Sequence, residues 1–230
     1  GSRGYCLHNI REERGCAPRM NLFNRVFYFF VKWFFFIALK VYNRLSITWT
    51  EDLPSRNVIV AANHTSNLDP VIMGAVFPRR LRYLAKEELF RPFLFGSAIR
   101  ALGSIPVKRS DNQSAASALR TFLKLLESGE NVLIFPEGGR STDGRMQPLE
   151  GGVALIALKS GAPIVPAFIT GAFEAMPPGR RWVKPGKLSI TFGEAINTAD
   201  YGKFGGEARG RLLNDLSDIF ASFESGARRS

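Results

Sequence analysis

The sequence predicts an α/β fold in which a mostly parallel central sheet is covered by helices. Short apolar runs rich in β-branched residues, such as 58–62 and 132–135, alternate with longer stretches that have helical periodicity. That alternation is typical of a parallel sheet with helices on both faces. The chain has 230 residues, 45% of them hydrophobic, which is enough for one sizeable core and excludes a disordered protein.

The chain divides into three regions. Residues 1–19 are polar and without periodicity, and we leave this tail or tag-like segment out of the fold. It contains both cysteines, Cys6 and Cys16, which provide no disulfide framework for the rest of the chain. Residues 20–50 form an N-terminal membrane-associating helical region, and residues 51–230 form the α/β domain.

Residues 22–42 predict a helix, or a helix pair, that is dense in aromatic side chains. Its length nearly suits a membrane span, but three cations, Arg25, Lys32 and Lys40, interrupt it. At 100° per residue these cations share one face, so the pattern favours a helix lying in the membrane interface. The alternative is an amphipathic helix that packs on the protein's own core.

The remaining elements follow in order. Strands are expected at 45–50, 58–62, 82–86, 104–107, 132–135, 163–168 and 188–192, and helices at 71–77, 87–101, 112–127, 150–160 and 208–223. Ligands of such sheets bind beyond the carboxyl ends of the strands.

A histidine and an aspartate flank the turn after the strand at 58–62. We expect His64 at the carboxyl end of that strand, with Asp69 as the N-cap of the next helix and Pro70 at its first position. A carboxylate beside an imidazole makes a general base. Ser66 lies within the turn and the chain has no Gly-x-Ser-x-Gly elbow, so the base would deprotonate a substrate hydroxyl. The alternative is a capped helix beside a core histidine.

Cations follow two other strands. Residues 103–109 end on Lys108 and Arg109, and Arg140 follows two glycines in 135–141, a combination suited to an anion. The formal net charge of +11 likewise favours nucleic acid, an acidic membrane or a phosphorylated substrate. There are two histidines, with no His-x-x-x-His or Cys-x-x-Cys pair, so a zinc site is not expected.

Four motifs stand in the order found in the glycerolipid acyltransferases: Asn63-His64-x-x-x-x-Asp69, Gly103 to Arg109, Phe135-Pro136-Glu137-Gly138 and Val165-Pro166. The chain most resembles the bacterial 1-acylglycerol-3-phosphate (lysophosphatidic acid) acyltransferases, and the similarity spans about residues 58–168. One departure is Gly139, where the family usually carries threonine.

The resemblance implies a role for each motif residue. His64 would be the general base oriented by Asp69, and the acyl group would pass from acyl carrier protein or coenzyme A without an acyl-enzyme. The ligands of the lysolipid phosphate would be Arg109 and Arg140, with Lys86 added as a hypothesis, while Glu137 and Gly138 would shape the glycerol site. It implies no cofactor and no metal.

The partners implied are the bilayer, lysophosphatidic acid and the acyl donor, with no nucleic acid. The enzyme would be monotopic, on the cytoplasmic face of the inner membrane. Two alternatives stay open: a relative that acylates another lysolipid, and a non-catalytic basic protein that binds membranes or nucleic acid.

Overall fold

The computed structural model describes residues 22–107, 113–180, 182–202 and 204–227. The strands are β1 Ser46–Trp49, β2 Ile59–Ala62, β3 Leu81–Lys86, β4 Ser104–Val107, β5 Asn131–Ile134, β6 Ile164–Thr170 and β7 Ser189–Phe192. The helices are α1 Leu22–Tyr42, α2 Asp69–Val76, α3 Phe93–Ala101, α4 Gln113–Glu127, α5 Gly152–Ser160, α6 Ala172–Ala175 and α7 Gly206–Ala227, with 3-10 turns η1 Glu87–Phe90 and η2 Thr198–Tyr201.

The strands form one seven-stranded sheet in the order β1-β7-β6-β2-β5-β3-β4. Every neighbouring pair is parallel except β6 with β7, which run antiparallel. The α/β fold with a mostly parallel sheet is therefore confirmed. The edge strand β1 pairs with β7, so part of the predicted N-terminal region belongs to the sheet.

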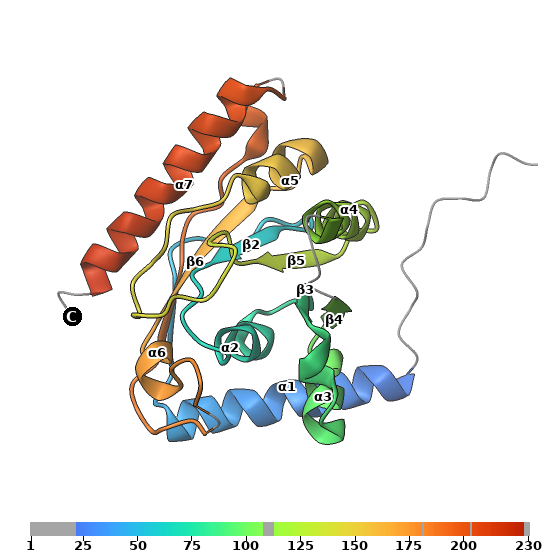
Figure 1. The fold of residues 1–230 in the computed structure, drawn as a ribbon, viewed down its shortest axis with the longest axis vertical. Helices are drawn as coiled ribbons and strands as arrows, with labels where there is room; N and C mark the ends of the chain where they lie inside the picture. The colour runs from blue at the N-terminus through green and yellow to red at the C-terminus, as the bar shows by residue number, and fades with distance from the viewer. Residues whose placement is uncertain (1–21, 108–112, 181, 203, 228–230) are drawn as a thin grey trace, which may run out of the picture.

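Helices cover both faces of the sheet. Helices α4, α5 and α7 lie over one face, and α1 and α2 lie over the other (Figure 1). Each face has its own apolar core, because the side chains of a strand alternate between the two faces: Val60 contributes to one core and Ile59 to the other.

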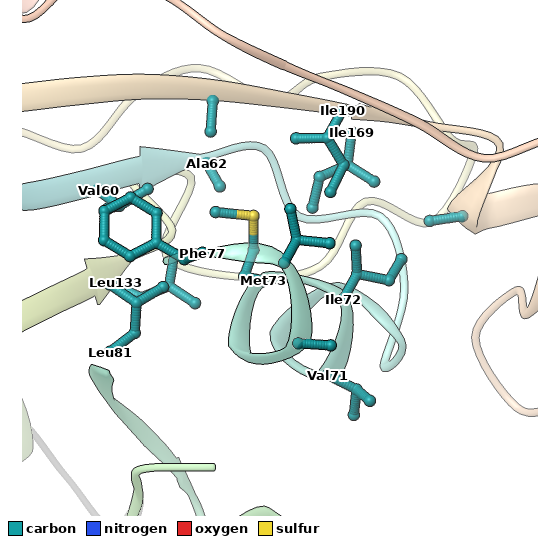
Figure 2. Close-up of a cluster of buried hydrophobic side chains, with 14 of the residues drawn as sticks. Val60, Ala62, Val71, Ile72, Met73, Phe77, Leu81, Leu133, Ile169 and Ile190 are labelled. Carbon is teal, nitrogen blue, oxygen red and sulfur yellow. The ribbon is translucent and has the colours of Figure 1, made fainter. Parts of the chain in front are cut away.

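Helix α2 is buried along its whole length, apart from the half-buried Pro70 at its start. Ile72, Met73 and Phe77 are fully buried and point among side chains of β2, β5 and β6 (Figure 2). Truncating a buried side chain of this size costs about 2–5 kcal/mol. The packing of α2 therefore fixes the position of its first residue, Asp69.

Two expected helices differ from the structure. The helix expected at 87–101 is split into η1 and α3 at Pro92, whose own backbone is extended, with a ψ of 116°, and which has no N–H for a helical hydrogen bond. Asp69 is not the N-cap of α2, because the helix begins at this residue and Leu68 holds the cap position. The Asp69 carboxylate instead accepts hydrogen bonds from the turn that precedes it.

Helix α1 is continuous from Leu22 to Tyr42 and packs against α2 and α3. One side of it is partly buried, through Tyr28, Val31, Phe35 and Leu39. The opposite side exposes a strip of large apolar residues: Leu22, Phe23, Val26, Phe27, Phe29, Phe30, Trp33, Phe34, Ile37 and Val41. By length and composition alone this helix could cross a membrane. Only 6% of its most apolar 18-residue stretch is buried in the protein.

Candidate active site

The carboxyl end of β2 leads directly into the turn that holds His64. The Nδ1 atom of His64 lies 2.9 Å from Oδ2 of Asp69. The same oxygen accepts the backbone N–H groups of Thr65 and Ser66, both at 2.7 Å. The predicted pairing of His64 with Asp69 is therefore present in the structure, and three donors converge on a single carboxylate oxygen.

The two members of this pair differ in exposure. Asp69 is completely buried, whereas 15% of the His64 side chain is exposed. Burial raises the pKa of Asp69, while the hydrogen bonds from His64, Ser66 and Thr65 lower it and favour the ionised acceptor. Since Nδ1 faces the carboxylate, Nε2 is the ring nitrogen left to exchange a proton with a substrate.

The loop after β5 holds His64 in place from two sides. The ring of Phe135 stacks on the imidazole, with 4.0 Å between ring centroids and 17° between planes. The backbone N–H of His64 donates to Oε1 of Glu137 at 2.6 Å, and its carbonyl accepts from the N–H of Ser141 at 2.8 Å. The dyad histidine is thereby fixed by residues more than 70 positions away.

Glu137 uses both carboxylate oxygens to bind backbone. Its Oε2 accepts the N–H of Gln147 at 2.7 Å, while its Oε1 accepts the N–H of His64, and the residue is 7% exposed. Burial raises the pKa of Glu137 to about 6, against the lowering effect of these two donors. The carboxylate thus ties the His64 turn to the loop around Gln147.

Gly138 has a backbone conformation that disfavours any other residue. Its φ is 68°, and a Cβ placed there would lie 2.2 Å from Oε1 of Glu150. Gly139 differs, because a Cβ at that position would meet nothing within 4 Å. A threonine at position 139, as in the family's usual motif, would fit in this structure.

A cavity of about 880 Å³ opens beside His64. Three of the predicted binding residues, Lys86, Gly138 and Arg140, line it together with His64. Asp69 and Glu137 are absent from its wall and lie behind it, as their burial indicates. Arg109 lies outside the described residues. The inner wall is apolar: Leu84, Leu119, Phe122, Leu133, Ile134, Leu155 and Ile156.

Two positioning contacts were not predicted. Asn63 makes two hydrogen bonds to Ile169 at the end of β6. The Asn63 Nδ2 donates to the Ile169 carbonyl at 2.9 Å, and the Asn63 Oδ1 accepts the Ile169 N–H at 2.7 Å. Ser66 Oγ donates to the carbonyl of Met176 at 2.7 Å and accepts the N–H of Leu68 at 3.0 Å. Asn63 directly precedes His64 in the Asn-His-x-x-x-x-Asp motif, and this adjacency is the sequence signal that could have indicated its positioning role.

Comparisons with known proteins place this site in a family. The acyltransferase family model matches residues 44–170. The chain is 33% identical over 166 residues to 1-acyl-sn-glycerol-3-phosphate acyltransferase of Bacillus subtilis (strain 168), covering 71% of this chain and 76% of that relative. A chloroplastic 1-acyl-sn-glycerol-3-phosphate acyltransferase of Brassica napus is 28% identical over 85% of this chain, which spans 58% of that relative's length.

The fold matches a solved structure of the same kind. The crystal structure of the 1-acyl-sn-glycerophosphate (LPA) acyltransferase PlsC from Thermotoga maritima aligns with a TM-score of 0.73 and 25% identity. The alignment covers 90% of this chain and 82% of that one. These matches confirm the family resemblance that the motifs indicated from sequence. The chain belongs to the acyltransferase family.

Proposed function

We propose that this protein transfers a fatty acyl group from an acyl thioester to the free sn-2 hydroxyl of 1-acylglycerol-3-phosphate and so makes phosphatidic acid. The relatives from Bacillus subtilis and Brassica napus carry the name of this activity. The observation that supports it most strongly is the His64–Asp69 pair, whose histidine lines a cavity that has cations at its rim and an apolar inner wall.

In the proposed reaction His64 acts as general base. Asp69 holds the proton on Nδ1, so Nε2 takes the proton of the acceptor hydroxyl as its oxygen attacks the thioester carbonyl. The C–O bond forms, the C–S bond breaks, and the imidazolium returns its proton to the thiolate that leaves. Asp69 stabilises the imidazolium while it exists.

The surroundings of the Ser66 hydroxyl support direct transfer without an acyl-enzyme. Ser66 is fully buried, and its Oγ is already bonded to Met176 and Leu68. A serine nucleophile needs a free Oγ beside the base. The acceptor hydroxyl is therefore the nucleophile in this proposal.

In this proposal the basic rim and the apolar inner wall of the cavity bind different parts of the substrates. Arg140 and Lys86 are exposed cations at its rim, and we propose that they bind the phosphate of the acceptor, with Arg109 as a further ligand. Gly138 lines the cavity and, in this proposal, shapes the glycerol site, while Glu137 contributes by holding His64. The apolar inner wall provides a place for an acyl chain.

We propose that the protein is monotopic and lies on the cytoplasmic face of the membrane through α1. The apolar strip of α1 faces away from the domain, while the other side of the helix packs on α2 and α3. A helix held in this way lies along the bilayer surface, because crossing the bilayer would pull it from the domain.

The test is acyl transfer by the purified full chain in mixed micelles. A radiolabelled palmitoyl thioester of coenzyme A or of acyl carrier protein is supplied with lysophosphatidic acid, lysophosphatidylcholine or lysophosphatidylglycerol. Labelled phosphatidic acid as the main product supports the proposal. A clear preference for another lysolipid would contradict the acceptor, and no transfer to any acceptor would contradict the reaction.

A further inference from the structure

The loop that follows α6 is joined to the C-terminal end of α1. The Tyr42 hydroxyl donates to the carbonyl of Val183 at 3.4 Å, and Asn43 Nδ2 donates to the carbonyl of Lys184 at 2.9 Å. The carbonyl of Asn43 accepts the N–H of Leu188 at 3.0 Å. Figure 1 shows this orange loop reaching the end of the blue helix. The two segments, 141 residues apart in sequence, therefore form one surface.

The described part of this loop, residues 177–180 and 182–187, presents an exposed aromatic ring among cations. Trp182 is 83% exposed. Arg180, Lys184 and Lys187 are also exposed, and Glu174 is the one acidic residue between positions 171 and 188 of the sequence. Tryptophan rings favour the headgroup level of a bilayer, and cations near an anionic bilayer are attracted to it.

Helix α3 brings a second exposed apolar point to α1. Phe93 and Leu94 open α3, each is 82% exposed, and α3 packs against α1. Exposed apolar side chains from two separate segments thus lie beside one helix whose own outer face is apolar. Scattered single side chains are ordinary on a soluble surface, whereas a gathered set marks an interaction site.

We propose that residues 177–180 and 182–187 of this loop and the Phe93–Leu94 pair form, with the outer face of α1, one surface that contacts an anionic bilayer. This inference rests on the proposed membrane association of α1 and extends it. If α1 were the only contact with the bilayer, the whole protein would be free to rotate about the axis of this helix. Contacts away from that axis remove this freedom, so the loop and α3 fix how the domain, and the mouth of its cavity, face the lipid.

A bilayer fits this surface better than a protein partner does. The apolar strip of α1 runs through 21 residues, which is about 30 Å at the rise of an α-helix. The cations of the loop lie at one end of that strip, where Tyr42 and Asn43 meet the loop. An acidic acyl carrier protein would complement the positive charges of the loop, but its binding would not require a long apolar strip beside them.

The first test uses the three tryptophans of the chain, which lie on α1, in the loop and on β1. Trp33 is 46% exposed on α1, Trp182 lies in the loop, and Trp49 is half-buried on β1, where it stacks on Phe192 with 3.8 Å between ring centroids. Three double Trp→Phe variants of the full chain each keep a single tryptophan. Their fluorescence is measured with vesicles of phosphatidylglycerol and phosphatidylcholine whose acyl chains carry bromine, a contact quencher.

The proposal predicts quenching and a blue shift for Trp33 and Trp182, and neither for Trp49. Quenching of Trp33 alone would overturn the inference and leave the α1 anchor intact. Absence of quenching at both positions would overturn the anchor and the inference together. A Trp182 response to acyl carrier protein, with none to vesicles, would make the loop a carrier site instead. None of these readouts depends on acyl transfer.

The second test removes the charges. Arg180→Gln, Lys184→Gln and Lys187→Gln together should weaken binding to the anionic vesicles about a hundredfold, at about fivefold for each cation. Binding to neutral vesicles should stay the same. The matched control replaces three exposed cations on the far face of the sheet, Arg120, Lys124 and Lys159. An equal loss in the control would assign the effect to the general basic charge and overturn the inference.

Discussion

Replacing Asp69 by asparagine removes the charge behind His64 while keeping nearly all of its contacts. The asparagine oxygen can take the place of Oδ2 and accept from His64, Thr65 and Ser66, as Oδ2 does at 2.7–2.9 Å. The amide nitrogen then stands where Oδ1 is, an atom that has no hydrogen-bond partner within the described part of the chain. The side chain has the same shape, so the variant isolates the effect of charge.

The expected loss follows from the attraction between carboxylate and imidazolium. With Nδ1 and Oδ2 2.9 Å apart, the two charge centres are separated by about 4 Å. At an effective dielectric constant of about 20 their attraction is about 4 kcal/mol. Because the proton transfer is incomplete in the transition state, we expect a loss of about 3–4 kcal/mol, which lowers kcat by about a hundredfold to a thousandfold.

The assay measures kcat, KM and the thermal unfolding temperature of Asp69→Asn beside the wild type. KM should change little, since Asp69 lies behind the cavity wall. Burial raises the pKa of Asp69, so loss of the charge should leave the unfolding temperature equal or higher. Asp218→Asn, an exposed change on α7, is the control. A natively folded Asp69→Asn enzyme with kcat within tenfold of wild type would refute the reasoning.

Three further predictions concern stability, each measured by urea unfolding. Gly139→Thr should change the unfolding free energy by no more than about 0.5 kcal/mol, whereas Gly138→Thr, at a φ of 68°, should cost at least about 1–2 kcal/mol; equal costs would contradict the backbone argument. The pKa of Glu137 is raised to about 6, so its contribution to stability is present at low pH and lost as pH rises. Glu137→Gln should therefore gain about 1–2 kcal/mol relative to wild type between pH 4.5 and 7, and a constant difference would refute the raised pKa. Lys32→Met, which removes the ammonium donating to the carbonyls of Phe77 and Pro78, should cost about 1–2 kcal/mol; Arg25→Met, an exposed change on the same helix, should cost nothing.

The parts of the fold that could be predicted are those with a local cause. The buried strand before His64 was found from its β-branched run, and it ends within one residue of its predicted bounds. The split at Pro92 was missed although proline is a local signal. The antiparallel pairing of β6 with β7 was not predicted, because strand direction depends on a connection whose path the sequence does not show.

The parts of the site that lie within one sequence motif could be predicted. His64 and Asp69 lie five positions apart, so their pairing is a local event that spacing can indicate. Glu137 was assigned to the glycerol site, and that role stays a prediction, but its bonds to His64 and Gln147 span two loops. Lys32 was grouped with the other cations of α1, yet it turns toward the end of α2, a partner 45 residues away.

The membrane prediction shows the same division between local and tertiary information. The sequence left open whether residues 22–42 pack on the core or face lipid. In the structure one side of α1, with Leu39, packs on the core and the other side, with Phe34, is exposed. The period of the helix could suggest two faces, but only the position of α2 decides which face is covered.

The most direct test of the account is acyl transfer to lysophosphatidic acid by wild type and His64→Ala at equal folded concentration. Both are assayed in detergent with a labelled acyl thioester, and binding of both to vesicles is measured in parallel. The account predicts that wild type makes phosphatidic acid, while His64→Ala makes none above background and still binds vesicles as wild type does. Turnover by His64→Ala near the wild-type rate would contradict the proposed chemistry.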